Sequence, residues 1–156
     1  MPNRLRDPVT GLWDDAFFHA SVRTRLAVAR RELRPLAIVL LGLGDADGTL
    51  DPGDATAREA AYAFLRTLRE CDQASRLDDG AFGILLEATD ERGAVLCVDR
   101  LRALLADGGN RHVVWAGIAA YPTHSLDAGN LVLASRVALC DARRWATSRI
   151  EVAVLP

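Results

Sequence analysis

The sequence predicts an α+β fold in which a central, mostly antiparallel sheet of about five strands is flanked by helices. Three observations lead to this prediction. Apolar residues recur at helical spacing in four segments, apolar runs suited to buried strands separate these segments, and an Asp-Gly dipeptide at residues 79–80 is typical of a tight hairpin turn. The expected order of elements along the chain is α-β-α-β-β-α-β-α-β.

The first helix is predicted from apolar residues that repeat every three or four positions, namely Phe18, Val22, Leu26, Ala29 and Leu33. Pro35 ends this helix, because a proline disfavours helical backbone at the residue before it. The apolar run over residues 36–43 is typical of a strand buried on both faces, and a turn-rich loop over residues 44–54 follows it.

The second helix is expected to begin near Asp54 or Thr56, and Thr56 with Glu59 has the spacing of a capping box. Its buried side is predicted from apolar positions at helical spacing, which are Ala57, Ala61, Phe64 or Leu65, and Leu68. Two short strands then flank the Asp79-Gly80 turn.

The rest of the chain predicts two more helices and two more strands. Four apolar residues mark the third helix: Ala94, Val98, Leu101 and Leu105. Residues 112–120 form the next expected strand, residues 125–144 the fourth helix, and residues 148–155 the last strand.

Length, charge and cysteine content limit the possible functions. At 156 residues the chain is long enough for one domain, and we treat residues 1–156 as a single domain. The net charge of −2 gives no bulk attraction to DNA, RNA or anionic lipid, and no apolar run is long enough for membrane insertion. Cys71, Cys97 and Cys140 are odd in number and far apart, which is typical of reduced thiols in a cytoplasmic protein.

Three separated segments carry a family resemblance. Residues 7–12 (DPVTGL), 113–122 (VVWAGIAAYP) and 137–152 (VALCDARRWATSRIEV) resemble, in the same order, the opening, the S-I-G-I-A strand and the close of a GGDEF domain, the catalytic unit of diguanylate cyclases. The similarity extends from Asp7 to Val152. It implies the palm-like fold of nucleotidyl cyclases.

The family signature is altered. At residues 78–82 (DDGAF), aspartates stand in place of the two signature glycines, and Gly80 and Ala81 stand in place of its two acidic residues. The resemblance implies metal ligands at the end of the first strand and in the signature, but these positions are Gly42 and Gly80, which offer no side-chain oxygen to Mg²⁺. We therefore expect a domain that is not an enzyme and has no metal or cofactor. Its degenerate positions are Gly42, Asp78, Asp79, Gly80 and Ala81.

An acidic loop offers one other place for a cation. Asp45, Asp47 and Asp51 crowd the loop after the first strand, but Thr56 stands where a calcium loop needs a bidentate Glu. Acidic residues interspersed with Gly and Pro more often form a solvated turn, and this is the interpretation we adopt.

A second family site is retained in the sequence. Arg69-Glu70-Cys71-Asp72 has the R-x-x-D pattern of the inhibitory site, or I-site, at which diguanylate cyclases bind their product cyclic di-GMP, and Arg100 would complete it. The pattern is expected to end the second helix, where residues three apart project from one face, so that Arg69 and Asp72 address one guanine. An Arg fork suits guanine O6 and N7 or a phosphate, and Asp accepts a hydrogen bond from guanine N1–H.

Two functions remain open from the sequence. The first is a receptor or signalling module that binds cyclic di-GMP through Arg69, Asp72 and Arg100, with a ligand-bridged homodimer as one consequence. The second is a scaffold or dimerisation domain that binds no nucleotide and docks a partner signalling protein. A solvated ion pair would explain Arg69 and Asp72 without any ligand.

Overall fold

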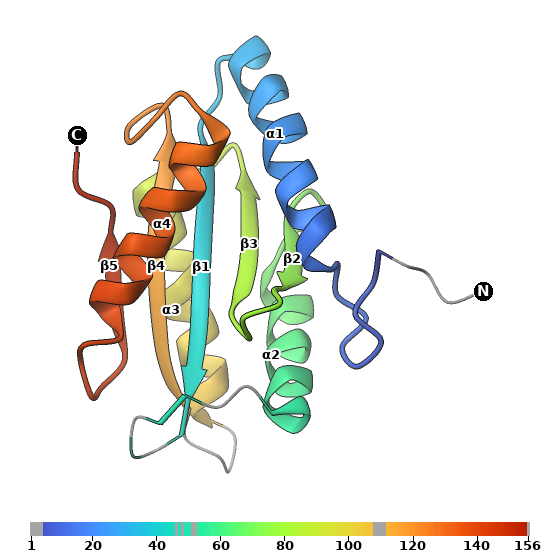
Figure 1. The fold of residues 1–156 in the computed structure, drawn as a ribbon, viewed down its shortest axis with the longest axis vertical. Coiled ribbons are helices and arrows are strands. Elements are labelled where there is room, and N and C mark those ends of the chain that lie inside the picture. Colours follow the sequence, from blue (N-terminus) through green and yellow to red (C-terminus); the bar gives the residue numbers. More distant parts are fainter. Residues whose placement is uncertain (1–4, 46, 48, 51–52, 108–111, 156) are drawn as a thin grey trace.

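The computed structural model describes residues 5–45, 47, 49–50, 53–107 and 112–155. It contains four helices and five strands in the predicted order. They are α1 (Asp15–Glu32), β1 (Leu36–Gly44), α2 (Asp54–Thr67), β2 (Gln73–Arg76), β3 (Phe82–Glu87), α3 (Glu91–Asp107), β4 (Val113–Tyr121), α4 (Ala128–Ala142) and β5 (Arg149–Val152). The predicted α+β class is confirmed (Figure 1). No helix in these described stretches is both long enough and apolar enough to span a membrane.

The five strands form one mixed sheet in the order β2-β3-β1-β4-β5. All neighbours are antiparallel except β4 and β5, which are parallel. β1 lies at the centre, and all nine of its residues are buried, as its apolar run predicts. In the register, Leu41 of β1 pairs with Phe82 of β3, so the end of β1 lies beside the β2–β3 hairpin.

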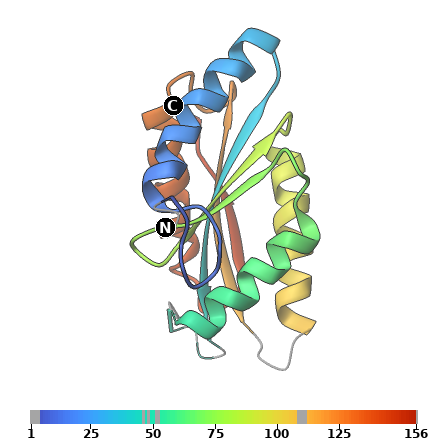
Figure 2. The same cartoon turned by 90° about the vertical axis from the view of Figure 1, so that its right-hand side faces the viewer.

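Two helices cover each face of the sheet (Figures 1 and 2). Because successive side chains of a strand point to opposite faces, β1 contributes to two cores. Val39 and Leu41 pack in the core beneath α2 and α3, whereas Ile38 and Leu40 pack in the core beneath α1 and α4. The sheet is therefore the middle layer of three.

Helix α1 begins and ends with specific caps. Asp14 accepts a hydrogen bond from the Phe17 N–H at 2.8 Å, and Leu33 ends the helix in the left-handed conformation with φ of 54°. The prediction that Leu33 belongs to the buried stripe is wrong, because this cap turns the side chain outward and leaves it 88% exposed.

Helix α2 begins at Asp54, as predicted, but without the predicted cap. Its N-cap is Gly53, which supplies no side-chain hydrogen bond, and Thr56 lies within the first turn. The predicted capping box is therefore wrong. Phe64 is buried and Leu65 is 81% exposed, so Phe64 is the member of this pair that packs in the core.

Candidate functional site

The R-x-x-D residues lie in the turn between α2 and β2. Helix α2 ends at Thr67, and Leu68 already has extended backbone, with φ of −78° and ψ of 148°. The Asp72 N–H then donates to the Arg69 carbonyl oxygen at 3.0 Å and closes the turn. The prediction that Arg69 and Asp72 share one face of a helix is therefore wrong, although the turn brings the two side chains together.

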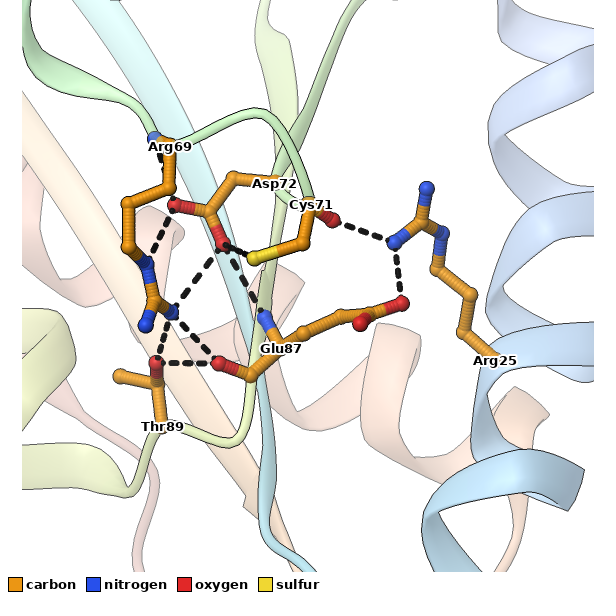
Figure 3. Close-up of polar contacts among 6 residues, drawn as sticks. All are labelled: Arg25, Arg69, Cys71, Asp72, Glu87 and Thr89. Carbon is orange, nitrogen blue, oxygen red and sulfur yellow. Dashed lines mark hydrogen bonds and ion pairs between the residues drawn. The ribbon is translucent and has the colours of Figure 1, made fainter.

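Asp72 holds Arg69 by three hydrogen bonds (Figure 3). Its Oδ2 accepts from the Arg69 backbone N–H at 3.0 Å and from Nε at 3.3 Å, and its Oδ1 accepts from Nη2 at 3.3 Å. The Asp72 side chain is 4% exposed, whereas that of Arg69 is 56% exposed. The hydrogen bond and the charge of Asp72 raise the pKa of Arg69, so the presented group is a fixed cation.

The end of β3 supplies a second anchor for the same guanidinium. Arg69 Nη2 donates to the Glu87 carbonyl oxygen at 2.6 Å and to Thr89 Oγ1 at 2.9 Å. The Glu87 N–H in turn donates to Asp72 Oδ1 at 3.2 Å. Both oxygens of Asp72 are thus engaged, and its carboxylate orients Arg69 (Figure 3).

Arg100 lies on the exposed side of α3, as predicted, next to the buried Leu101. Burial raises the pKa of the Cys97 thiol, and the positive charges of Arg100 and Arg69 act in the opposite direction. Both arginines therefore lie within electrostatic range of one thiol. In the part of the chain that the structure describes, no hydrogen bond or ion pair joins Arg100 to Arg69 or Asp72.

Sequence reasoning missed three residues that support this turn. Glu87 and Thr89 contact Arg69 as described above, and Arg25 of α1 donates through Nη1 to the Cys71 carbonyl oxygen at 2.6 Å. No motif marks these positions, because they lie 15 or more residues from the turn or act through backbone atoms. The Asp79-Gly80 turn sets the register of β2 and β3, which could have placed Glu87 near the start of β2 but could not have predicted its contact with Asp72.

The β2–β3 hairpin turns tightly between Leu77 and Ala81, as predicted. The Leu77 N–H donates to the Ala81 carbonyl oxygen at 2.8 Å, and Gly80 has φ of 88°, which favours glycine. Asp79 Oδ1 accepts from the Ala81 N–H at 3.0 Å, and its Oδ2 pairs with Arg136 at 2.6 Å. Burial raises the pKa of Asp79, but these two partners lower it by a larger amount. The pKa therefore lies below its ordinary value, and the carboxylate stays ionised.

Gly42 lies at the end of β1, beneath the guanidinium of Arg143. A Cβ at Gly42 would lie 2.8 Å from Arg143 Nη2. The two predicted metal positions, Gly42 and Gly80, supply no side-chain oxygen and so do not fit a divalent cation by themselves. Within the described ranges, no group of three or more His, Cys, Asp and Glu is placed to hold a metal ion.

In the acidic loop after β1, the side chains of Asp45 and Asp47 both accept a hydrogen bond from the Thr49 N–H at 3.0 Å. Asp51, the third aspartate of this loop, lies outside the described residues.

Residues 4–149 match the family described as "Diguanylate cyclase, GGDEF domain". The chain belongs to the GGDEF family. Among curated proteins none matches the sequence. The palm-like fold predicted from the resemblance is confirmed.

Solved GGDEF domains share this fold. That of TpbB (YfiN) from Pseudomonas aeruginosa is 25% identical, with a TM-score of 0.83 over 96% of this chain and 95% of the other. The GGDEF domain of FimX from the same organism is 20% identical, with a TM-score of 0.81 over 95% and 99% of the two chains. The GGDEF domain of DgcB from Caulobacter crescentus, solved in complex with c-di-GMP, is 16% identical, with a TM-score of 0.82 over 97% and 94%.

The GGDEF family match contradicts the expectation that this chain is not an enzyme, because the matched family is that of the diguanylate cyclases. The expectation rested on the glycines at two positions. Divalent cations accept oxygen ligands from any residues that converge on them, not only from these two positions. The identity of Gly42 and Gly80 is therefore too narrow a basis for excluding activity.

Proposed function

We propose that this GGDEF domain binds cyclic di-GMP at a site made by Arg69, Asp72 and Arg100 and acts as a receptor module for that ligand. The observation that supports the proposal best is the state of Arg69. Its guanidinium is exposed and is held in one orientation by the buried Asp72 carboxylate and the Glu87 carbonyl oxygen. A charged fork that is already ordered loses less conformational entropy when it binds an anion.

The free edge of Arg69 is the proposed ligand contact. Nε and Nη2 donate to protein oxygens, whereas Nη1 makes no hydrogen bond with the described residues and points away from Asp72 in Figure 3. The two N–H donors of Nη1 suit a phosphate oxygen or a single acceptor such as guanine O6. Both Asp72 oxygens accept hydrogen bonds from the protein. We therefore assign Asp72 the role of orienting Arg69, and not the direct contact with a base that the sequence led us to expect.

Arg100 supplies a second cation on the neighbouring helix. Its side chain is exposed, and its charge acts on the same Cys97 thiol as that of Arg69. Two guanidinium groups facing solvent on adjacent elements suit a ligand that carries two phosphates and two purines, through ion pairing and stacking. DgcB, which shares the fold, was solved with c-di-GMP bound, and this likeness agrees with the proposal.

Titration calorimetry with cyclic di-GMP tests the proposal. We expect the wild type to bind, and Arg69→Ala and Arg100→Ala each to weaken binding by about tenfold or more, as expected for a charge-assisted contact. Arg102→Ala is the matched control, because Arg102 lies on α3 two residues from Arg100 and pairs only with Asp99 at 3.2 Å among the described residues. No heat from the wild type at millimolar ligand would refute the receptor proposal and favour the docking of a partner protein.

Sedimentation in the same titration addresses the homodimer. A ligand that binds as a stacked pair can bridge two copies through the arginines of both. If it does so here, the sedimentation coefficient will rise with cyclic di-GMP in the wild type and in Arg102→Ala, but not in Arg69→Ala.

Family membership favours diguanylate cyclase activity as a second candidate function. The test is incubation with GTP and Mg²⁺ or Mn²⁺, followed by chromatography of the nucleotides. Formation of pppGpG or cyclic di-GMP would support it. No product under conditions where another GGDEF cyclase turns over would count against it.

A further inference from the structure

Arg25 connects α1 to the turn that carries Arg69 and Asp72. Its Nη1 donates to the Cys71 carbonyl oxygen at 2.6 Å, within that turn, and also forms an ion pair with Glu87 Oε1 (Figure 3). The Arg25 side chain is 25% exposed, so the pair is partly shielded from solvent. The contact joins residues that are 46 and 62 positions apart in the sequence.

Glu87 carries this connection to the ligand-binding residues. Its carboxylate binds Arg25, its N–H donates to Asp72 Oδ1 at 3.2 Å, and its carbonyl oxygen accepts from Arg69 Nη2 at 2.6 Å. One residue of β3 therefore contacts α1 through its side chain and the proposed site through its backbone. A shift of α1 along the sheet would pull on Cys71 and Glu87 together.

The packing of α1 against the sheet means that the whole helix would move together in such a shift. Val22, Leu26 and Ala29 bury one side of α1 against the sheet, and Arg25 reaches from the edge of this buried stripe. A packed helix moves as a unit against its sheet more readily than it deforms. The position of α1 and the geometry of the turn are thus linked through two polar contacts of a single side chain.

We propose that Arg25 is a positioning residue that holds the Arg69–Asp72 turn in its ligand-binding geometry and thereby couples α1 to ligand occupancy. The inference rests on the proposed function, since the ligand is cyclic di-GMP at the site described above. Coupling between two sites is reciprocal. Displacement of α1 weakens binding, and binding restrains α1.

Two measurements on the full chain test this inference, with Arg23→Ala as the matched control. Arg23 is an exposed arginine of α1 two residues from Arg25. In calorimetry with cyclic di-GMP, we expect Arg25→Ala to weaken binding by about fivefold or more, the lower range of allosteric coupling, and Arg23→Ala to bind like the wild type. Glu87→Gln keeps the backbone contacts and weakens the ion pair, so its effect and that of Arg25→Ala should not add in the double variant.

Hydrogen exchange separates positioning from simple stabilisation. In the ligand-free protein, Arg25→Ala should speed exchange of the Asp72 and Glu87 amides, while Arg23→Ala leaves them unchanged. Cyclic di-GMP should slow exchange in α1 of the wild type but not of Arg25→Ala. Wild-type affinity in a folded Arg25→Ala variant, or unchanged exchange in α1, would overturn the inference alone. Failure of the wild type to bind would overturn the proposed function and this inference with it.

Discussion

The guanidinium of Arg143 occupies the space that a side chain at Gly42 would fill. A Cβ built on Gly42 would lie 2.8 Å from Arg143 Nη2 and 3.1 Å from Nε. Both nitrogens are buried, and neither has a hydrogen-bond partner among the residues described. The two residues are therefore coupled by shape, since the arginine fits only because position 42 lacks a side chain.

This fit predicts that Gly42→Ala destabilises the protein through Arg143. The new methyl group forces the guanidinium aside, and because this group ends a flexible side chain, we expect a loss of about 1 kcal/mol in the free energy of unfolding, the lower end for overpacking. Urea unfolding would measure the loss. In an Arg143→Ala background the same substitution should cost much less, and equal losses in both backgrounds would contradict the proposed steric coupling.

Asp72 should matter for stability as well as for binding. Asp72→Asn replaces a buried acceptor oxygen with an amide that faces N–H donors, so we expect a loss of about 2–3 kcal/mol in unfolding free energy. Thermal unfolding provides the measurement. The control is Asp99→Asn, because Asp99 is 45% exposed and pairs with Arg102 on the surface; its effect should stay below about 0.5 kcal/mol.

Gly117 sets the distance between β4 and α4. A Cβ there would lie 2.1 Å from the Ser135 carbonyl oxygen and 2.3 Å from the Leu139 N, both of them backbone atoms. Gly117→Ala must push α4 off the sheet, and we expect it to cost about 3 kcal/mol or more. Gly129→Ala, in the first turn of the same helix, meets only Asp127 Oδ2 at 3.3 Å and should be neutral or stabilising by about 0.5–1 kcal/mol. A stable Gly117→Ala variant in a denaturant titration would contradict this packing.

Asp7 is expected to make stability depend on pH in the acid range. Burial raises the pKa of Asp7, but the hydrogen bonds from Thr10 and the charge of Arg76 together lower it by a larger amount. The folded-state pKa therefore lies below the ordinary value of 3.8. A group with a depressed folded pKa stabilises the fold above its unfolded pKa and loses this contribution as the pH falls through the folded value. Asp7→Asn should therefore lower the Tm at pH 7, and its deficit against the wild type should shrink below pH 3.8.

The control for this pH effect is Asp141→Asn, because Asp141 meets Arg144 only at 3.8 Å on an exposed surface. This variant should change the Tm little at either pH. A deficit of Asp7→Asn that stays constant down to pH 2 would show that the carboxylate charge is not its cause.

The order of elements could be predicted from the sequence because the apolar periodicity of each segment is local information. Helix ends were less predictable. Leu33 continues the spacing of the α1 stripe, yet a single left-handed residue places it in solvent. Thr56 and Glu59 have capping-box spacing, but α2 starts at Asp54 because the loop enters it through Gly53.

The pairing of Arg69 with Asp72 could be predicted from the sequence, but its geometry could not. The R-x-x-D spacing brought Arg69 and Asp72 together, as expected. That Asp72 is buried depends on the Glu87 N–H, fifteen residues later, which reaches it only when β2 and β3 pair. The role of Arg25 could not be predicted from the sequence for the same reason, since the tertiary fold brings it to its partners Cys71 and Glu87. No sequence pattern distinguishes Arg25 from the other arginines of α1.

The four residues of β2 separate Asp72 from the hairpin that starts at Leu77. At about 3.3 Å per residue, this strand fixes a spacing of about 13 Å between the two loops. Adding or deleting one residue would rotate one loop by half a turn relative to the other, because side chains alternate along a strand. The number of residues in β2 is thus expected to tolerate no insertion or deletion.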